Sequence, residues 1–139
     1  MNKKRVMVFG TFDILHLGHI SLFRQAKKLG DYLITVVGRD ATVENLKKIK
    51  TIHTEKERAS LLREIKLIDK VILGDKKQFY NVVINLRPDI IALGYDQTFF
   101  VDDLKKTIKE KKIPIKIVRM KAFKSKKFKS KKIKKHIDK

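Results

Sequence analysis

The stretch Gly10-Thr11-Phe12-Asp13-Ile14-Leu15-His16-Leu17-Gly18-His19 joins a continuous apolar run to an amphipathic one. Residues 6–9 before it are all apolar, as in a buried strand, and apolar side chains recur at helical spacing over residues 20–29 after it. The stretch is therefore predicted to be a strand-to-helix loop. Such a loop turns backbone N–H groups and the positive end of the helix dipole toward a ligand, which favours phosphate. Gly10 allows a ligand to approach closely, and Gly18 allows a tight entry into the helix.

Two of the four histidines, His16 and His19, lie three residues apart in this stretch. On the first turn of a helix this spacing points both rings to one side, so one pocket can hold both. A lone histidine is most often a surface or satisfied core residue, but a pair with glycine between them is more specific. A zinc site, the other functional interpretation, lacks any cysteine and any nearby carboxylate at a familiar ligand spacing. We therefore expect no metal held by these histidines.

A chain of 139 residues has room for one domain and one hydrophobic core. Its hydrophobic fraction of 42% is ordinary for a folded protein, and no apolar run approaches membrane-spanning length. Residues 1–5 lead straight into the first predicted strand rather than into a secretory signal. The absence of cysteine excludes disulfides and thiolate chemistry. We expect a cytoplasmic protein with no membrane partner.

The formal net charge of +20 raises nucleic acid as a partner. Residues 121–139, with ten lysines and one aspartate, carry +9 of it. Lysine makes up 28 of the 35 basic residues, and aromatic residues are not interleaved with it as a base-stacking surface requires. We therefore interpret the charge as solvated surface whose field attracts a polyanionic nucleotide, and expect no nucleic-acid partner.

Four more apolar runs are predicted as strands, and they alternate with amphipathic segments predicted as helices. These strands cover residues 32–37, 68–74, 90–93 and 115–118. The helices cover residues 19–29, 54–66, 78–86 and 101–111, and residues 41–54 form an ordered loop or a short helix. The order βαβαβαβαβ predicts an α/β fold: a single doubly wound, Rossmann-like domain with a parallel sheet of about five strands.

Ligands of such a sheet bind outside the carboxyl ends of its strands. Four segments follow those ends here, namely the 10–19 loop, Arg39-Asp40, residues 94–97 and Arg119. We expect one ligand to reach all of them.

The helix that follows residues 41–54 begins with a capping box formed by Thr54 and Glu57. Arg58 lies in its first turn, where a cation opposes the helix dipole. We interpret this arginine as aimed at a phosphate.

The motif GTFDxxHxGH, residues 10–19, resembles the signature of the HxGH nucleotidyltransferases in their cytidylyltransferase-like branch. The resemblance extends over nearly the whole chain. Glu57-Arg58 and residues 65–69, IKLID, are similar to the ER…I+xxD helix of this family. Residues 93–97, LGYDQ, resemble the archaeal-type FAD synthetases, whereas glycerol-3-phosphate cytidylyltransferases usually show GDDW there.

The carboxyl-terminal part of the chain extends this resemblance. Arg119 and residues 130–133, SKKI, are similar to the closing (S/T)xxI signature, although the family often has paired hydroxyl residues where this chain has Ser130-Lys131. We therefore expect a nucleotidyltransferase domain over residues 1–120. We expect residues 121–139 to be a basic tail whose short helix, from about residue 130 to residue 137, closes over the site.

The resemblance implies attack by an acceptor phosphate on the α-phosphorus of a nucleoside triphosphate, with release of pyrophosphate and no covalent enzyme intermediate. The favoured reaction is the adenylylation of FMN to FAD, with ATP as the triphosphate. The alternative is a cytidylyltransferase that uses CTP with glycerol 3-phosphate or another phospho-alcohol. A non-catalytic nucleotide- or nucleic-acid-binding module is a third interpretation. Mg²⁺ is implied by the triphosphate, and a homodimer is compatible with the family.

The same resemblance suggests roles for individual residues. His16 and His19 are expected on the triphosphate and the charge that develops at the α-phosphorus, and Lys47 or Lys48 on the acceptor side or the β and γ phosphates. Arg119 is expected to pair with phosphate bidentately, and Asp13 to have a structural or metal-linked role. Nucleotide contacts are expected from Gly10, Thr11, Phe12, Gly18, Arg39, Asp40, Gly94, Tyr95, Gln97 and Ser130, and a ribose or base contact from Asp96.

Overall fold

The computed structural model describes residues 3–76, 78, 80–98 and 100–122, and this part of the chain forms five strands and five helices. Strands and helices alternate, except that two consecutive helices lie between the second and third strands. The strands are β1 (Arg5–Gly10), β2 (Tyr32–Val37), β3 (Lys70–Leu73), β4 (Ile90–Leu93) and β5 (Lys116–Arg119). The helices are α1 (Leu17–Lys27), α2 (Asp40–Lys47), α3 (Glu55–Arg63), α4 (Tyr80–Leu86) and α5 (Val101–Glu110). None of these helices is long and apolar enough to cross a membrane.

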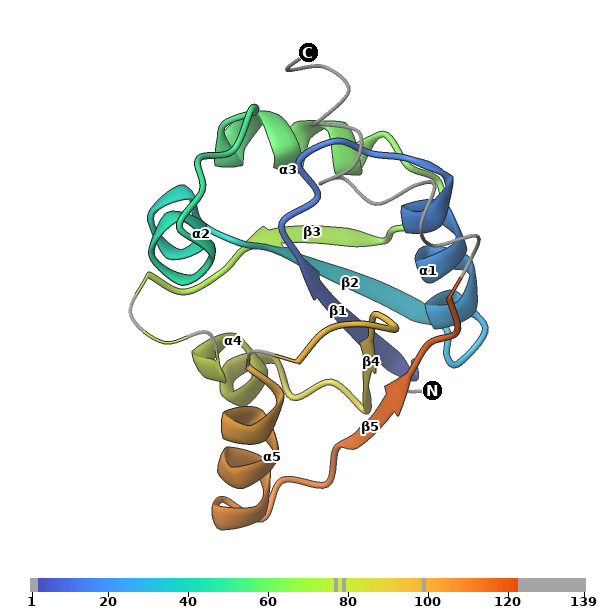
Figure 1. Ribbon diagram of the computed structural model, residues 1–139. Helices are drawn as coiled ribbons and strands as arrows, with labels where there is room; N and C mark the ends of the chain where they lie inside the picture. Colours follow the sequence, from blue (N-terminus) through green and yellow to red (C-terminus); the bar gives the residue numbers. More distant parts are fainter. Residues whose placement is uncertain (1–2, 77, 79, 99, 123–139) are drawn as a thin grey trace.

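The strands form one parallel sheet in the order β3-β2-β1-β4-β5, which confirms the predicted doubly wound α/β fold. The chain reverses direction across the sheet at β1, since β2 pairs on one side of it and β4 on the other. Figure 1 shows the 10–19 loop leaving β1 at this central position. In sheets of this kind the reversal point is where ligands bind.

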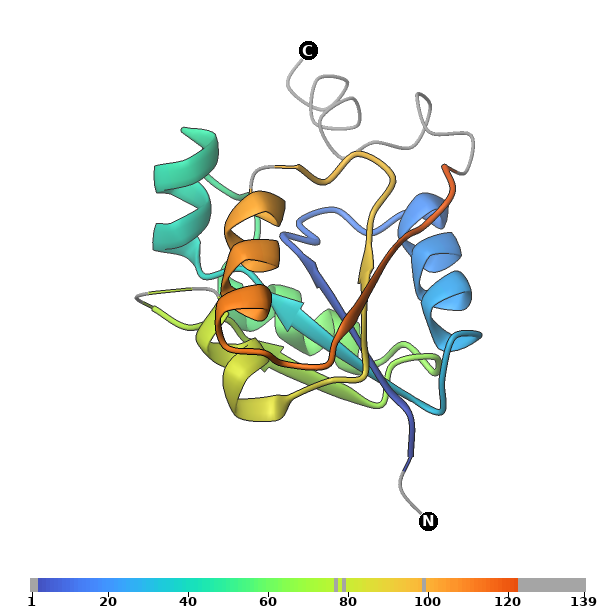
Figure 2. The same ribbon diagram turned by 90° about the horizontal axis from the view of Figure 1, so that it is seen from below.

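Both faces of the sheet are covered, because successive side chains of a strand point to opposite faces. On one face Val6 and Val8 pack with residues of α1 and α3 such as Phe23 and Leu62. On the other face Met7 packs with residues of α4 and α5 in a second cluster. Figures 1 and 2 show α1 and α5 on opposite sides of the sheet. The continuous apolar strands of the sequence are thus explained by burial on both faces.

Several element boundaries differ from the sequence predictions. The predicted 41–54 segment contains a helix, α2, which begins one residue earlier, at Asp40. The strand predicted over residues 68–74 is shortened to β3, while the capping box of Thr54 and Glu57 is present as predicted. The tail helix predicted over residues 130–137, with Ser130, lies outside the described residues.

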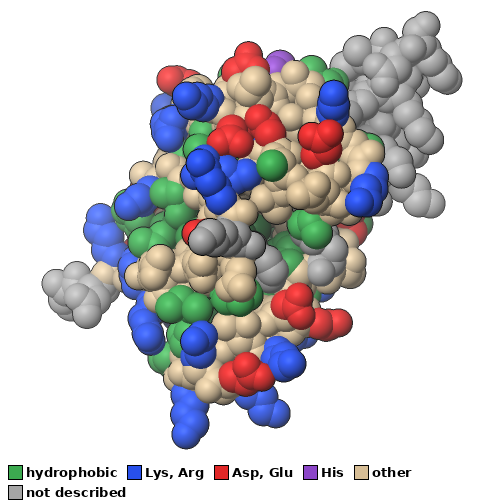
Figure 3. Space-filling view, turned by 90° about the vertical axis from the view of Figure 1, so that its left-hand side faces the viewer, with side chains coloured by type: hydrophobic (Ala, Val, Ile, Leu, Met, Phe, Trp, Pro, Cys, Tyr) green, Lys and Arg blue, Asp and Glu red, His purple; other side chains and the backbone are tan. Residues whose placement is uncertain are grey.

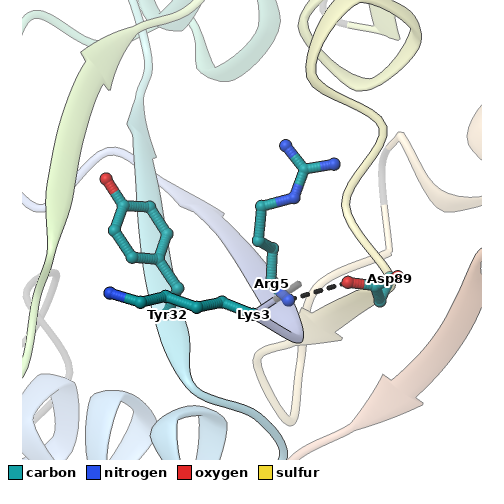
Figure 4. A pocket seen from close by; sticks show the side chains of 4 residues that line it. All are labelled: Lys3, Arg5, Tyr32 and Asp89. Atoms are coloured by element: carbon teal, nitrogen blue, oxygen red, sulfur yellow. Dashed lines mark hydrogen bonds between the residues drawn. The ribbon is translucent and has the colours of Figure 1, made fainter. Parts of the chain in front are cut away.

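A hollow of about 480 Å³ lies at the opposite edge of the sheet from the 10–19 loop. It is lined by Lys3, Arg5, Tyr32 and Asp89, at the amino ends of β1, β2 and β4 (Figure 4). The carboxylate of Asp89 accepts the backbone N–H of Arg5 at 2.8 Å. None of the residues proposed for the site lies at this edge.

Candidate active site

His16 and His19 cap the amino end of α1. The Nδ1 atom of His16, the N-cap residue, accepts the backbone N–H of Gly18 at 3.1 Å. The Nδ1 atom of His19 accepts the backbone N–H of His16 at 3.2 Å. This is a capping box in which histidines occupy the positions usually taken by Ser or Thr and by Glu. The HxGH spacing thereby stacks the two rings, whose centroids are 3.9 Å apart.

These hydrogen bonds also determine where each ring carries its proton. Because Nδ1 accepts a hydrogen bond in both rings, the proton of each neutral imidazole is on Nε2. Burial lowers the pKa of His16, and burial, His16 and Lys47 together lower the pKa of His19 to about 3. Both rings are therefore neutral Nε2–H donors at neutral pH, placed at the positive end of the α1 dipole. Such donors suit a phosphate oxygen.

The ring of Phe12 packs against the ring of His19. The Phe12 ring contacts His19 edge-on at a centroid distance of 5.5 Å and packs on Phe23 at 5.4 Å. Phe12 has a φ of 52°, whereas no described glycine has a positive φ. A Cβ added at Gly10 would lie 2.5 Å from the Phe12 ring. The structure thus gives a further reason for glycine at position 10, which is the room that the Phe12 ring occupies.

Lys47 is the last residue of α2, and its side chain contacts the 10–19 loop. Its Nζ donates to the Oγ1 atom of Thr11 at 2.9 Å. The next residue, Lys48, is the exposed C-cap of α2, with a φ of 59°. Of the two lysines proposed from the sequence, the structure brings Lys47 against the loop.

Asp13 has a structural role in the loop. Its buried carboxylate accepts the backbone N–H groups of Ile52 at 2.7 Å and His53 at 2.9 Å. Both oxygens are thus used to fasten the segment after α2 to the 10–19 loop, which supports the structural alternative for this residue.

Arg58 is fully buried beneath the same loop. Its guanidinium donates to the carbonyl of Thr11 at 2.7 Å, the carbonyl of His53 at 3.2 Å and the Oδ1 atom of Asp40 at 2.6 Å. The interpretation of Arg58 as a phosphate ligand is therefore wrong. The arginine joins three chain segments. Its ion pair with the Asp40 carboxylate explains why a cation is tolerated in the first turn of α3.

Arg39 and Asp40 lie at the predicted edge, but their side chains face protein partners. Burial alone would raise the pKa of Asp40, but hydrogen bonds from Arg58 and the backbone of Glu55 lower it overall. Arg39 donates to the Glu55 carboxylate and to the carbonyl of Gly74, both at 2.8 Å. These contacts position α2 and α3. Sequence reasoning missed Glu55, for which the only signal was an acid in the first turn of a helix.

The turn after β4 is held by Gln97 and Arg119. The side-chain amide of Gln97 accepts the N–H of Gly94 and donates to the carbonyl of Phe9, both at 2.8 Å. The Nη1 atom of Arg119 donates to the carbonyls of Gly94, Tyr95 and Gln97 at 2.9, 3.3 and 2.8 Å. The turn is thereby fixed beside the end of β1. A phosphate contact from Arg119 has to use its other two nitrogens.

The distribution of surface charge and the set of possible metal ligands complete the description of the site. Lys and Arg side chains on the face shown in Figure 3 are interspersed with acidic ones. Within the described ranges, no three His, Asp or Glu side chains gather as metal ligands. Asp13, the carboxylate in the loop, is engaged by backbone N–H groups, so this donor set does not fit a metal held by the protein alone.

The chain is similar in sequence to known proteins. The model of the "Cytidylyltransferase-like" family matches residues 7–136. A FAD synthase of Thermoplasma volcanium is 48% identical over 114 residues, which cover 82% of this chain and 80% of that protein. A FAD synthase of Thermococcus sibiricus is 44% identical over 117 residues, covering 84% of this chain and 79% of that protein.

Solved structures share the fold of this chain. The crystal structure of a Thermoplasma volcanium protein, described as a lipopolysaccharide core biosynthesis protein, has a TM-score of 0.82 and 44% identity. The match covers 88% of this chain and 99% of that one. A pantoate-beta-alanine ligase of Francisella tularensis shares the fold, with a TM-score of 0.63 and 17% identity over 95% of this chain and 68% of that one. On these matches the chain belongs to the cytidylyltransferase-like family, alongside the archaeal FAD synthases.

Proposed function

We propose that this protein is an FMN adenylyltransferase, which forms FAD from ATP and FMN. The observation that carries the proposal is the pair of neutral, Nε2-protonated histidines at the amino end of α1. Relatives named FAD synthase, 40–48% identical over most of the chain, support FMN as the acceptor. The LGYDQ turn, in which Gln97 ties Gly94 to β1, is in line with this choice over a cytidylyltransferase.

In the proposed reaction a phosphate oxygen of FMN attacks the α-phosphorus of ATP. The bond from the α-phosphorus to the bridging oxygen breaks, and pyrophosphate leaves with the electron pair, so two phosphates become joined in FAD. Such a transfer depends on positioning and charge stabilisation more than on an enzyme nucleophile. His16 and His19 donate to the oxygens on which negative charge increases, while the α1 dipole and Lys47 stabilise the triphosphate.

Other residues bind and orient the substrates in this proposal. Thr11 and Phe12 present the loop backbone to the triphosphate, and Tyr95 and Asp96 contact the nucleoside. Gly18, whose N–H is donated to His16, allows the triphosphate to approach the start of α1 closely. Arg119 contacts phosphate through the nitrogens that do not hold the turn. Ser130 and the 121–139 tail, outside the described residues, are proposed to close over the nucleotide.

A divalent ion such as Mg²⁺ is proposed to enter with ATP, where it neutralises phosphate charge. No step of the proposed mechanism depends on a protein-held ion.

The test is to measure pyrophosphate release by the purified protein with each pairing of ATP or CTP with FMN or glycerol 3-phosphate. The proposal predicts release with ATP and FMN and a stoichiometric amount of FAD. Release that requires CTP and glycerol 3-phosphate would instead establish the cytidylyltransferase alternative.

A further inference from the structure

Five large apolar side chains are about half exposed in the described part of the chain. Apolar residues scattered singly on a surface are common, but three of these five lie within seven residues of one another. The exposed fractions are 56% for Leu17, 56% for Leu46, 48% for Ile49, 50% for Ile52 and 47% for Leu61.

The segment that carries three of them, residues 46–52, is fastened to the 10–19 loop near both of its ends. Lys47 donates to Thr11 at 2.9 Å, and the backbone N–H of Ile52 donates to Asp13 at 2.7 Å. The segment that carries these exposed apolar side chains therefore borders the proposed triphosphate site. Leu61, by contrast, lies on α3, outside this segment.

The sheet order separates this segment from the turn proposed to hold the nucleoside. Residues 46–52 follow β2 and α2, whereas residues 94–97 follow β4, and β2 and β4 flank β1 on opposite sides. A triphosphate bound at the end of β1 would have its nucleoside on the β4 side. The β2 side then remains for the acceptor that attacks the α-phosphorus.

The side chains of the segment indicate which kind of acceptor fits there. Leu46, Ile49 and Ile52 alternate with Lys47, Lys48 and Lys50. Apolar surface interleaved with cations is complementary to a ligand that combines a broad apolar ring with a phosphate group. Glycerol phosphate has the phosphate but no apolar ring, whereas FMN has both.

We propose that Leu46, Ile49 and Ile52 form the surface that receives the isoalloxazine ring of FMN and so determine the specificity for a flavin acceptor. This inference rests on the proposed function, because it concerns the acceptor of the same reaction. Lys48 and Lys50, two of the exposed lysines of the segment, attract the phosphate of FMN toward the loop.

The experiment compares substitutions of the three side chains with a matched control in the full-length protein. Leu46→Gln, Ile49→Gln and Ile52→Gln remove apolar surface at exposed positions. Of the three, Leu46 alone lies in a helix, α2, and Gln is a good helix former. Leu61→Gln makes the same change at an equally exposed site on α3. Affinity for FMN is measured from its fluorescence in a titration, and KM and kcat are measured from FAD formation.

Each of the three variants should bind FMN about tenfold more weakly, since each loses roughly half the burial energy of a large apolar side chain. The KM for FMN should rise in parallel, while the KM for ATP and the kcat at saturating FMN stay within about twofold. Leu61→Gln should behave as the wild type. Riboflavin, which lacks the phosphate, should lose affinity in the same three variants but not in Lys50→Gln.

Two results separate this inference from the proposed function. If the wild-type protein forms FAD but all three folded variants bind FMN as tightly as the wild type, the inference is wrong and the proposed function stands. Wild-type protein that neither binds FMN nor forms FAD removes the proposed function as well. If the variants change only sedimentation or vesicle binding, the segment is an interface with a second copy or with lipid, and the inference is wrong.

Discussion

Replacing His16 by Asn separates two tasks that the structure gives to one side chain. The Nδ1 atom of His16 caps α1 by accepting the N–H of Gly18, while its Nε2–H is the proposed donor to phosphate. Asn is a preferred N-cap residue whose side-chain oxygen can accept the same N–H group. It cannot place a donor where Nε2 lies. His16→Asn should therefore keep the cap and lose the donor, whereas His16→Ala loses both.

The expected magnitudes follow from these contacts. Loss of a preorganised donor to developing negative charge typically lowers kcat by about 100- to 1000-fold, so both variants should fall by this factor. Loss of the cap costs about 1 kcal/mol of folding free energy in His16→Ala, against a few tenths in His16→Asn. For a domain of this size, 1 kcal/mol corresponds to a shift in Tm of about 4 °C.

The assay combines FAD formation with thermal unfolding followed by circular dichroism. If His16→Asn retains a rate near that of the wild type, His16 is not a catalytic donor. If His16→Asn and His16→Ala are equally destabilised, the capping hydrogen bond does not contribute to stability.

Three further predictions concern the supports of the loop. Arg58→Met should lower the free energy of unfolding, measured by urea denaturation, by about 3 kcal/mol, because the carbonyl of Thr11 loses its buried donor. The control is Arg63→Met, at an exposed position of the same helix, and equal effects of the two substitutions would contradict the assignment. Gly10→Ala should cost about 1–3 kcal/mol and lower kcat, because the new Cβ collides with Phe12; an unchanged protein would refute this packing. The ring signals of His19 in NMR spectra should stay constant between pH 8 and 5, and a titration midpoint near 6.5 in the folded protein would contradict the buried, neutral ring. The contribution of His19 to stability should fall as the pH drops from 6.5 toward 3, because the unfolded state binds the proton more tightly than the folded state.

The fold was predictable from the sequence because its signals are local. Continuous apolar runs separated by amphipathic segments indicated parallel strands buried on both faces, and the structure has them. The capping box of Thr54 and Glu57 depends on residues three apart, so it too was visible. The segments after the strands were correctly placed at one edge of the sheet, since a parallel sheet brings all carboxyl ends together.

The contacts within the site were less predictable, because they join residues far apart in the chain. Arg58 and Thr11 are 47 positions apart, and no pattern in the sequence shows that the carbonyl of Thr11 needs a buried donor. The same applies to Gln97, whose amide bonds to Phe9 across 88 positions. Sequence reasoning therefore identified charged residues near the site but could not distinguish those that face protein partners from those that face solvent.

The most direct test of the account is to identify the product formed from ATP and FMN. Purified protein is incubated with both substrates and Mg²⁺, the nucleotides are separated by chromatography, and pyrophosphate is measured in the same sample. The account predicts one FAD for each pyrophosphate, and its near-complete loss in the His16→Asn protein. Absence of FAD with active transfer from CTP to glycerol 3-phosphate, or FAD formation that does not depend on His16, would contradict it.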